Sequence, residues 1–333
     1  MKKILKARET TSFLFLAALF LLVGIINPSF LTLSNISACF NTSVVYTLIA
    51  VGMAFAIFVG EIDVSVGSNL GLVAAVVGTM IQNGSNWFAA FAVGICIGAV
   101  VGLINGWGVA VMKIPSLIFT LGTNGILRGM MYLQVGAEQV NQLPKAFKDI
   151  SSMTLVGSFT IYYCCAVLLT LLIHALLTRT RKGRYFIAVG DNAGGAELVG
   201  IPATRTKVLA YVICGVLSAI GGIIFCSRIG IVTSLSGNGY EMKAVAACVL
   251  GGISLSGGVG SVIGAAIGAV IMASISYLLV FMNFSSNYDN AITGVILITI
   301  VVIDALMQHR AAVNNRHARL SARTAASGKE GTK

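Results

Sequence analysis

Residues 87–112 read WFAAFAVGICIGAVVGLINGWGVAVM, and no side chain in this stretch carries a charge. As a helix it is long enough to cross the roughly 30 Å of hydrocarbon in a bilayer, which takes about 20 residues. Its apolar residues are nearly continuous, whereas a helix on the surface of a soluble protein confines them to one face. The stretch therefore predicts a transmembrane helix.

Comparable apolar stretches fill most of the chain. Of its 333 residues, 57% are hydrophobic and only 10% are charged, against about 25% charged in an ordinary soluble domain. This composition excludes a soluble globule and leaves no room for a catalytic domain outside the membrane. The predicted fold is an all-α, polytopic helical bundle in a membrane, with a transmembrane domain over 13–308. We expect about ten transmembrane helices, the first of them short and 243–254 too short to cross alone; they lie at approximately 13–26, 44–60, 64–82, 87–112, 114–135, 155–177, 208–228, 243–254, 259–282 and 291–308.

Basic residues gather between the apolar stretches. The first nine residues carry four Lys or Arg side chains, and residues 179–207 and 310–333 carry six each. The positive-inside rule places such segments in the cytoplasm. We therefore expect a basic cytoplasmic N-terminus at 1–12, a cytoplasmic loop at 179–207 and a basic cytoplasmic tail at 309–333. Basic clusters separated by apolar blocks are unlike the continuous basic face of a nucleic-acid-binding protein, so no nucleic-acid partner is expected.

The chain shows none of the common catalytic motifs. It has no phosphate-binding loop, no His-Glu-x-x-His motif and no Gly-x-Ser-x-Gly elbow, and its histidines stand apart at His174, His309 and His317. The seven cysteines lack Cys-x-x-Cys spacing and mostly lie in apolar stretches, which is typical of small buried residues. We therefore expect no catalytic residue, no metal and no cofactor on this chain.

Two series of glycines recur every four residues. This spacing lines one helix face with small residues and lets a neighbouring helix approach closely. We predict tight helix packing at Gly94, Gly98, Gly102 and Gly106 and at Gly260, Gly264 and Gly268.

A polar cluster, Glu61-Ile62-Asp63-Val64-Ser65, separates two apolar stretches. Carboxylates close to hydrocarbon are costly and commonly mark a transport pathway, a helix cap or a charge partner. Asp63 or Ser65 would cap a helix that begins at Val64 by accepting hydrogen bonds from its free N–H groups. The pattern leaves both roles open, a cap and the lining of a path.

A second polar group follows Pro115, which suits the first turn of a helix. In that helix Thr120, Thr123 and Asn124 share one face. Uncharged hydroxyl and amide groups suit a polyhydroxy solute better than an ion, although such groups also join membrane helices to one another. This face either lines a polar path or bonds two helices together.

The basic loop 179–207 contains a predicted short helix. Asp191 or Asn192 would cap it, and Gly200 and Pro202 would stop it. A loop attached to anionic lipid by its Arg and Lys side chains is the alternative. Because that alternative gives the apolar end of the helix no purpose, we expect a helix that docks onto a protein partner.

Four motifs occur in a fixed order between residues 40 and 305. They are Gly-Glu-Ile-Asp-Val-Ser-Val-Gly-Ser (60–68), Asn105-Gly106 followed by Ile-Pro-Ser-Leu-Ile-Phe-Thr-Leu-Gly-Thr (114–123), Gly-Arg-Tyr-Phe-Ile-Ala-Val-Gly-Asp-Asn (183–192) leading to Gly200-Ile201, and Glu-Met-Lys-Ala-Val-Ala-Ala-Cys-Val-Leu-Gly-Gly-Ile-Ser-Leu-Ser-Gly-Gly (241–258). Together they resemble the ribose-type permeases of ATP-binding-cassette importers, which take up simple sugars and sugar-like solutes of the ribose, rhamnose or autoinducer-2 type.

The resemblance implies a multi-pass transport subunit of the bacterial inner (cytoplasmic) membrane rather than an enzyme. Its pore would be formed with a second permease chain, either another copy or a paralogue, and a periplasmic solute-binding protein would deliver the solute. A cytoplasmic ATPase that binds ATP and Mg²⁺ would dock on residues that include Arg184, Asp191, Asn192, Glu197 and Gly200. The candidates for lining the translocation path are Asp63, Ser65, Asn105, Thr120, Thr123 and Asn124.

Glu241 and Lys243 fall on the outer side of the membrane and are candidates for contact with the binding protein. An ion pair between these two residues is the alternative.

The alternative function for the chain is a self-sufficient secondary carrier for a small polar solute. Such carriers, however, usually contain a network of ionisable groups inside the membrane. Here Arg128 is the main charged residue within a predicted span.

Overall fold

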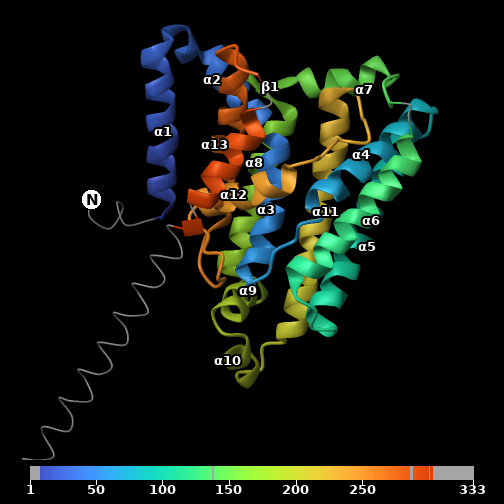
Figure 1. Ribbon diagram of the computed structural model, residues 1–333, viewed down its shortest axis with the longest axis vertical. Coiled ribbons are helices and arrows are strands. Elements are labelled where there is room, and N and C mark those ends of the chain that lie inside the picture. Colours follow the sequence, from blue (N-terminus) through green and yellow to red (C-terminus); the bar gives the residue numbers. More distant parts are fainter. Residues whose placement is uncertain (1–7, 137–138, 286–287, 300, 303–333) are drawn as a thin grey trace, which may run out of the picture.

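The computed structural model describes residues 8–136, 139–285, 288–299 and 301–302, and these form a helical bundle (Figure 1). The helices are α1 (Arg8–Ile26), α2 (Leu33–Thr42), α3 (Val44–Phe58), α4 (Val66–Gln82), α5 (Trp87–Gly106), α6 (Ser116–Val135), α7 (Lys145–Asp149), α8 (Ile161–Arg179), α9 (Arg181–Asp191), α10 (Ala193–Leu198), α11 (Ala203–Ile229), α12 (Tyr240–Leu250) and α13 (Val262–Phe281). Residues 288–299 are also helical. One antiparallel hairpin, β1 (Thr154–Val156) and β2 (Phe159–Thr160), interrupts them. The helical membrane fold is thus as predicted.

Helices α3 and α11 form the centre of the bundle. Every residue of α3 is buried, and α11 packs against α3, α4 and α5. At Gly52 of α3, a Cβ atom would lie 3.2 Å from the carbonyl oxygen of Cys214 on α11. The two central helices therefore pack almost backbone to backbone, as small residues allow in membrane proteins.

The glycines of α5 lie against neighbouring helices. A Cβ at Gly98 would lie 2.4 Å from the carbonyl oxygen of Gly215, and a Cβ at Gly102 would lie 2.4 Å from that of Tyr211, both on α11. Gly106 also faces α11, whereas Gly94 faces mainly α4. A larger residue at these positions would force α5 away from the core.

The second series of glycines is divided between a loop and a helix. Gly264 and Gly268 lie on α13, where Cβ atoms would come within 2.1 Å and 1.9 Å of the carbonyl oxygens of Gly251 and Ala247 at the end of α12. Gly260 precedes α13 and has a φ of +146°. The prediction of three glycines on one helix face was therefore wrong for Gly260.

Four helices among the described residues are long and apolar enough to cross a membrane: α5 with the π-helical turn that extends it to Val111, α8, α11 and α13. The pair α2 and α3, bent by 43°, is a fifth candidate, and Thr10–Ile26 and Val66–Gln82 are shorter apolar helices. The count of ten spans stays a prediction. Part of the last predicted span (303–308), the basic tail 309–333 and residues 1–7 lie outside the described residues.

The segment predicted as a span at 243–254 is a half-helix. Helix α12 ends at Leu250 and is entered through the non-helical loop 230–239. Gly230, Gly237 and Gly239 in this loop have positive φ angles, a conformation that favours glycine and ends a helix. Helix α12 has 11 residues, fewer than the roughly 20 that a helix needs to cross a bilayer alone.

Other elements had no counterpart in the prediction. The span expected at 155–177 begins only at Ile161, because residues 154–160 form the hairpin. Helices α2 and α9 contain too many polar residues to stand out as apolar stretches. A threonine side chain caps the N-terminus of each helix: Thr32 accepts a hydrogen bond from the backbone N–H of Asn35, and Thr180 accepts one from the backbone N–H of Gly183.

Candidate functional site

A non-helical break at residues 59–65 connects α3 to α4. Asp63 organises it, because its Oδ1 accepts hydrogen bonds from the backbone N–H of Ser65 at 2.9 Å and from the Ser65 hydroxyl at 2.6 Å. Helix α4 begins at Val66 rather than at Val64, so the expected helix start was two residues early. Neither Asp63 nor Ser65 caps this helix: its N-cap residue, Ser65, makes no side-chain capping bond, and Asp63 instead closes a turn before the helix by accepting the Ser65 N–H. The expected cap was therefore wrong.

Asn105 of α5 and Thr123 of α6 extend this network. The Asn105 side-chain amide donates to the Ser65 hydroxyl at 2.8 Å and to Asp63 Oδ1 at 3.2 Å. The Thr123 hydroxyl donates to Asn105 Oδ1 at 2.8 Å. Four candidate path residues from three elements thus form one chain of hydrogen bonds, which we call the break network (Asp63, Ser65, Asn105 and Thr123).

Thr120 of α6 joins the same region. Its hydroxyl accepts from the backbone N–H of Val64 at 3.1 Å and donates to the Ser116 carbonyl at 2.8 Å. Thr120, Asp63, Ser65 and Asn105 are all buried. The structure therefore shows the candidate path closed here, with the buried polar side chains hydrogen-bonded to one another and to the backbone.

Asn124 differs from its neighbours. Its Oδ1 is buried but accepts no hydrogen bond within the described part of the chain. Arg128, one helical turn further on, donates from Nη1 to the carbonyl oxygen of Ser236 at 2.7 Å. Helix α6 therefore places polar groups against the break 59–65 and α5 near its start and against the loop 230–239 further along.

The loop 230–239 brings the start of α12 onto α4. A Cβ at Gly67 would lie 2.5 Å from the carbonyl oxygen of Gly237 and 2.2 Å from Glu241 Oε2, and one at Gly71 would lie 2.4 Å from the Ser236 oxygen. Glu241 Oε1 also accepts from the backbone N–H of Gly239 at 3.3 Å. Two broken helices thus meet at their N-termini inside the bundle. Our sequence reasoning missed this contact, although the Gly67-x-x-x-Gly71 spacing is a signal for it.

Lys243 does not reach the surface, and the expectation that it contacts a binding protein was wrong. Its ammonium group is buried, forms an ion pair with Asp289 and donates to the Tyr46 hydroxyl at 3.3 Å. It also lies over the rings of Tyr46 and Tyr240. The alternative of an ion pair with Glu241 was wrong too, since Asp289 takes that place.

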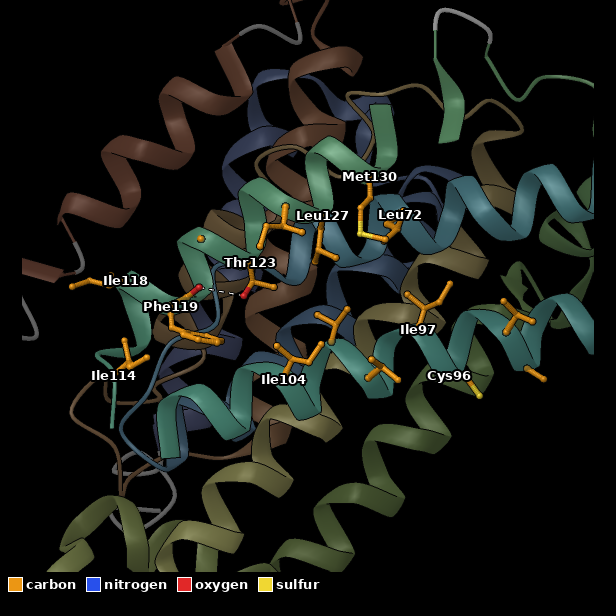
Figure 2. A pocket seen from close by; sticks show the side chains of 16 residues that line it. Leu72, Cys96, Ile97, Ile104, Ile114, Ile118, Phe119, Thr123, Leu127 and Met130 are labelled. Atoms are coloured by element: carbon orange, nitrogen blue, oxygen red, sulfur yellow. Dashed lines mark hydrogen bonds between the residues drawn. The ribbon is translucent and has the colours of Figure 1, made fainter. Parts of the chain in front are cut away.

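A groove runs between α5 and α6 (Figure 2). Its volume is about 810 Å³, and its lining is almost entirely apolar: Ile97 and Ile104 come from α5, and Phe119, Leu127 and Met130 come from α6. Three glycines of α6 face open space in the part of the chain that the structure describes, with no atom of it within 4 Å of a Cβ at Gly122, Gly125 or Gly129. Helix α6 is therefore buried along one narrow stripe only, at Thr120, Leu127, Met131 and Val135.

The basic loop folds into two helices at one end of the bundle, far from α7 and the hairpin (Figure 1). Asn192, not Asp191, caps α10, because its Oδ1 accepts from the backbone N–H of Gly195 at 2.8 Å; Asp191 is the last residue of α9. Helix α10 ends at Leu198, followed by Gly200 with a φ of +82°. Leu198 and Val199 are 90% and 76% exposed. The residues expected to dock an ATPase, Arg184, Asp191, Asn192, Glu197 and Gly200, are all exposed.

Comparison with known proteins identifies the family. The family described as "Branched-chain amino acid transport system / permease component" matches residues 35–301. The chain belongs to this permease family. Three similar proteins are each called "Autoinducer 2 import system permease protein LsrC": one from an Enterobacter species (39% identical, 94% of this chain, 92% of the relative), one from Klebsiella pneumoniae (37%, 95%, 92%) and one from Yersinia pseudotuberculosis (37%, 100%, 95%). No solved structure matches the chain.

The family and the apolar helices agree on the nature of this permease. It is a multi-pass protein of the inner membrane and the transmembrane subunit of an importer, as the four motifs predicted. The alternative of a self-sufficient secondary carrier is not favoured.

Proposed function

We propose that this permease imports autoinducer-2, or a closely similar sugar-like solute, with energy from an ATPase on a separate chain. The observation that carries the proposal is the match, over nearly the whole chain, to permeases named for autoinducer 2 import. The candidate path residues are consistent with it, because they offer hydroxyl and amide groups and one carboxylate. Such groups suit a neutral solute with many hydroxyls, whereas an amino acid needs a partner for each of its two charges.

The break network would line the path when the permease opens. In the closed arrangement Asn105 bonds to Ser65 on one side and to Thr123 on the other. If α6 moves away from α4 and α5, these groups lose their partners, and solute hydroxyls can take their place at little cost. Asp63, Thr120 and Asn124 lie beside this chain of hydrogen bonds and would join the lining.

The helices α9 and α10 would dock the ATPase, and we call residues 181–198 the docking segment. Leu198 and Val199 are apolar and exposed, and α10 lies at the end of the bundle (Figure 1). Glu197 and Arg184 add charge beside them. An apolar anchor with a polar surround is typical of a protein interface. ATP and Mg²⁺ would be bound by that partner, and the solute-binding protein would approach the opposite end.

A second permease chain would cover α6. Arg128 is only partly buried, and a cation facing lipid at this depth would be costly. The outward glycines, Gly122, Gly125 and Gly129, allow another helix to approach closely, and the groove beside them offers an apolar surface. Both features suit contact with protein better than contact with lipid.

Purification of the tagged protein from its native membrane in mild detergent tests this assembly. Mass spectrometry should find an ATPase subunit and either a paralogous permease or two copies of this chain. Recovery of this chain alone from folded preparations would contradict the proposal. For the solute, uptake of autoinducer-2 should exceed uptake of ribose and of leucine in cells that contain the whole importer; preferred uptake of leucine would overturn the solute assignment.

A further inference from the structure

The end of the bundle at α9 contains a junction made of backbone atoms. The Gly258 N–H donates to the Phe58 carbonyl oxygen at 3.0 Å, which joins the end of α3 to the loop between α12 and α13. Gly190, in the last turn of α9, covers this hydrogen bond. A Cβ at Gly190 would lie 1.7 Å from the Phe58 oxygen and 2.5 Å from the Gly258 nitrogen. Glycine is therefore the residue that lets α9 reach the junction.

Neighbouring backbone contacts close the same junction. A Cβ at Gly257 would lie 2.8 Å from the Gly60 nitrogen, and a Cβ at Gly258 would lie 2.7 Å from the Asp191 Cα atom. Three segments that are distant in the sequence thus meet with no flexible side chain between them. Because close-packed atoms transmit displacement rather than absorb it, a movement of one segment must move the others.

Helix α9 itself is held as a rigid element. Its Phe186 packs edge to face on Phe55 of α3, with ring centroids 5.0 Å apart. Its Gly183 touches the end of α8, where a Cβ would lie 2.3 Å from the Leu176 carbonyl oxygen. A force on the docking segment therefore reaches Gly190 through a helix with fixed packing at both ends.

Both loops at the junction lead to parts of the candidate path. Phe58 is followed by the break 59–65, which contains Asp63 and also Glu61, the ion-pair partner of Lys207 on α11. The loop 251–261 follows α12, whose N-terminus rests on Gly67 of α4. The junction thus contacts the segments attached to both broken helices.

We propose that Gly190 is a positioning residue that carries movement of the docking segment to the two broken helices, α4 and α12. The inference rests on the proposed docking of an ATPase at residues 181–198. When the ATPase pulls on α10, α9 shifts at Gly190, and the backbone contact moves the 59–65 and 251–261 loops together. A side chain at position 190 would separate the three segments and break this link.

The first test is Gly190→Ala in the complete importer, compared with Gly294→Ala, where a Cβ meets no atom of the described residues within 4 Å. We expect Gly190→Ala to retain the ATPase on co-purification but to lose at least tenfold in autoinducer-2 uptake. The ratio of ATP hydrolysis with and without the solute-loaded binding protein should fall toward unity, which a purely structural role would not cause. Gly294→Ala should remain within about twofold of the unmodified importer in both measurements.

Two outcomes separate this inference from the docking proposal. Near-normal uptake and stimulation in Gly190→Ala would overturn the role of Gly190 alone. Failure of the unmodified permease to retain an ATPase would overturn the docking proposal and this inference with it.

Hydrogen exchange of the unmodified importer provides a second measurement that does not depend on a variant folding. Trapping the ATPase with ATP and vanadate should change exchange in peptides that cover 58–65 and 251–261 as well as in the docking segment. A change confined to the docking segment would overturn the inference.

Discussion

The Asn105 amide lies 2.8 Å from the Ser65 hydroxyl and donates a hydrogen bond to it, which ties α5 to the break in front of α4. Asn105 is fully buried, and it also accepts from Thr123 of α6. One side chain thus holds three elements together at the candidate path.

Asn105→Ala should reduce both uptake and stability. It removes the amide that donates to Ser65 and Asp63 and the oxygen that accepts from Thr123. Asp63 keeps its Ser65 donors and Thr123 keeps the Phe119 carbonyl, so the cost is that of the lost hydrogen bonds, about 0.5–1.5 kcal/mol each. We expect a lower melting temperature in detergent and at least a tenfold loss of autoinducer-2 uptake. Asn83→Ala, on the exposed end of α4, is the control and should alter neither. A variant with normal uptake would exclude Asn105 from the path.

Gly98→Ala should destabilise the bundle by about 1–3 kcal/mol, the usual cost of overpacking. The new methyl group would lie 2.4 Å from the Gly215 carbonyl oxygen, so α5 must move away from α11. Thermal unfolding of the purified protein measures the effect. Gly294→Ala, in open space, is the matched control, and an equal melting temperature for the two variants would contradict the packing of α5.

Lys243→Met should be severely destabilising, because it leaves the other charge of a buried ion pair uncompensated. The expected loss in the free energy of unfolding is about 3–5 kcal/mol. Asp289 is the partner that would be left. Adding Asp289→Asn should recover part of the loss, because the amide oxygen can still accept from Ser276 and no charge remains. Accumulation in the membrane and thermal unfolding report both steps. Lys145→Met at an exposed site serves as the control; no recovery in the double variant would argue against the pair.

Glu197→Lys should weaken retention of the ATPase and abolish uptake while the protein still inserts into the membrane. The residue is exposed on α10 beside Leu198. A reversed charge on the rim of an interface chiefly impairs association. Asp149→Lys changes an exposed carboxylate at the far end of the bundle and should leave ATPase retention intact. Equal retention in both variants would place the docking surface elsewhere.

Gly129→Leu should prevent association with a second permease chain without harming the isolated subunit. Among the described residues no atom lies within 4 Å of a Cβ at Gly129, so the larger side chain fits the single chain. It would, however, keep an approaching helix at a distance. Co-purification of the second chain measures the effect, with Ala89→Leu on the exposed side of α5 as control. Unchanged association would remove α6 from the proposed interface.

The membrane class and most helices could be predicted from sequence because hydrocarbon requires long apolar stretches, and these dominate composition. The four-residue spacing of Gly94, Gly98, Gly102 and Gly106 likewise indicated a packed helix face. Breaks were harder to place. The loop 230–239 depends on glycines with positive φ, and hydropathy does not distinguish such glycines from those inside a helix.

The sequence allowed the individual residues of the candidate site to be predicted, but not the contacts between them. Asp63, Asn105 and Thr123 stood out in separate motifs, yet nothing in their spacing indicates that they touch. The pairing of Lys243 with Asp289 depends on where the last helix packs, which a local pattern does not contain. The same holds for Gly190 and Gly258, because contact between distant backbones is a property of the folded chain.

The Glu241 carboxylate lies between the N-termini of two helices, α12 and α4. It lies in the first turn of α12 and also against Gly67 in the first turn of α4, so one carboxylate faces the positive ends of two helix dipoles. Without it, two partial positive poles would oppose each other in a medium that screens charge poorly. Glu241 thus offsets the repulsion between the two helix ends and helps α4 and α12 to begin side by side.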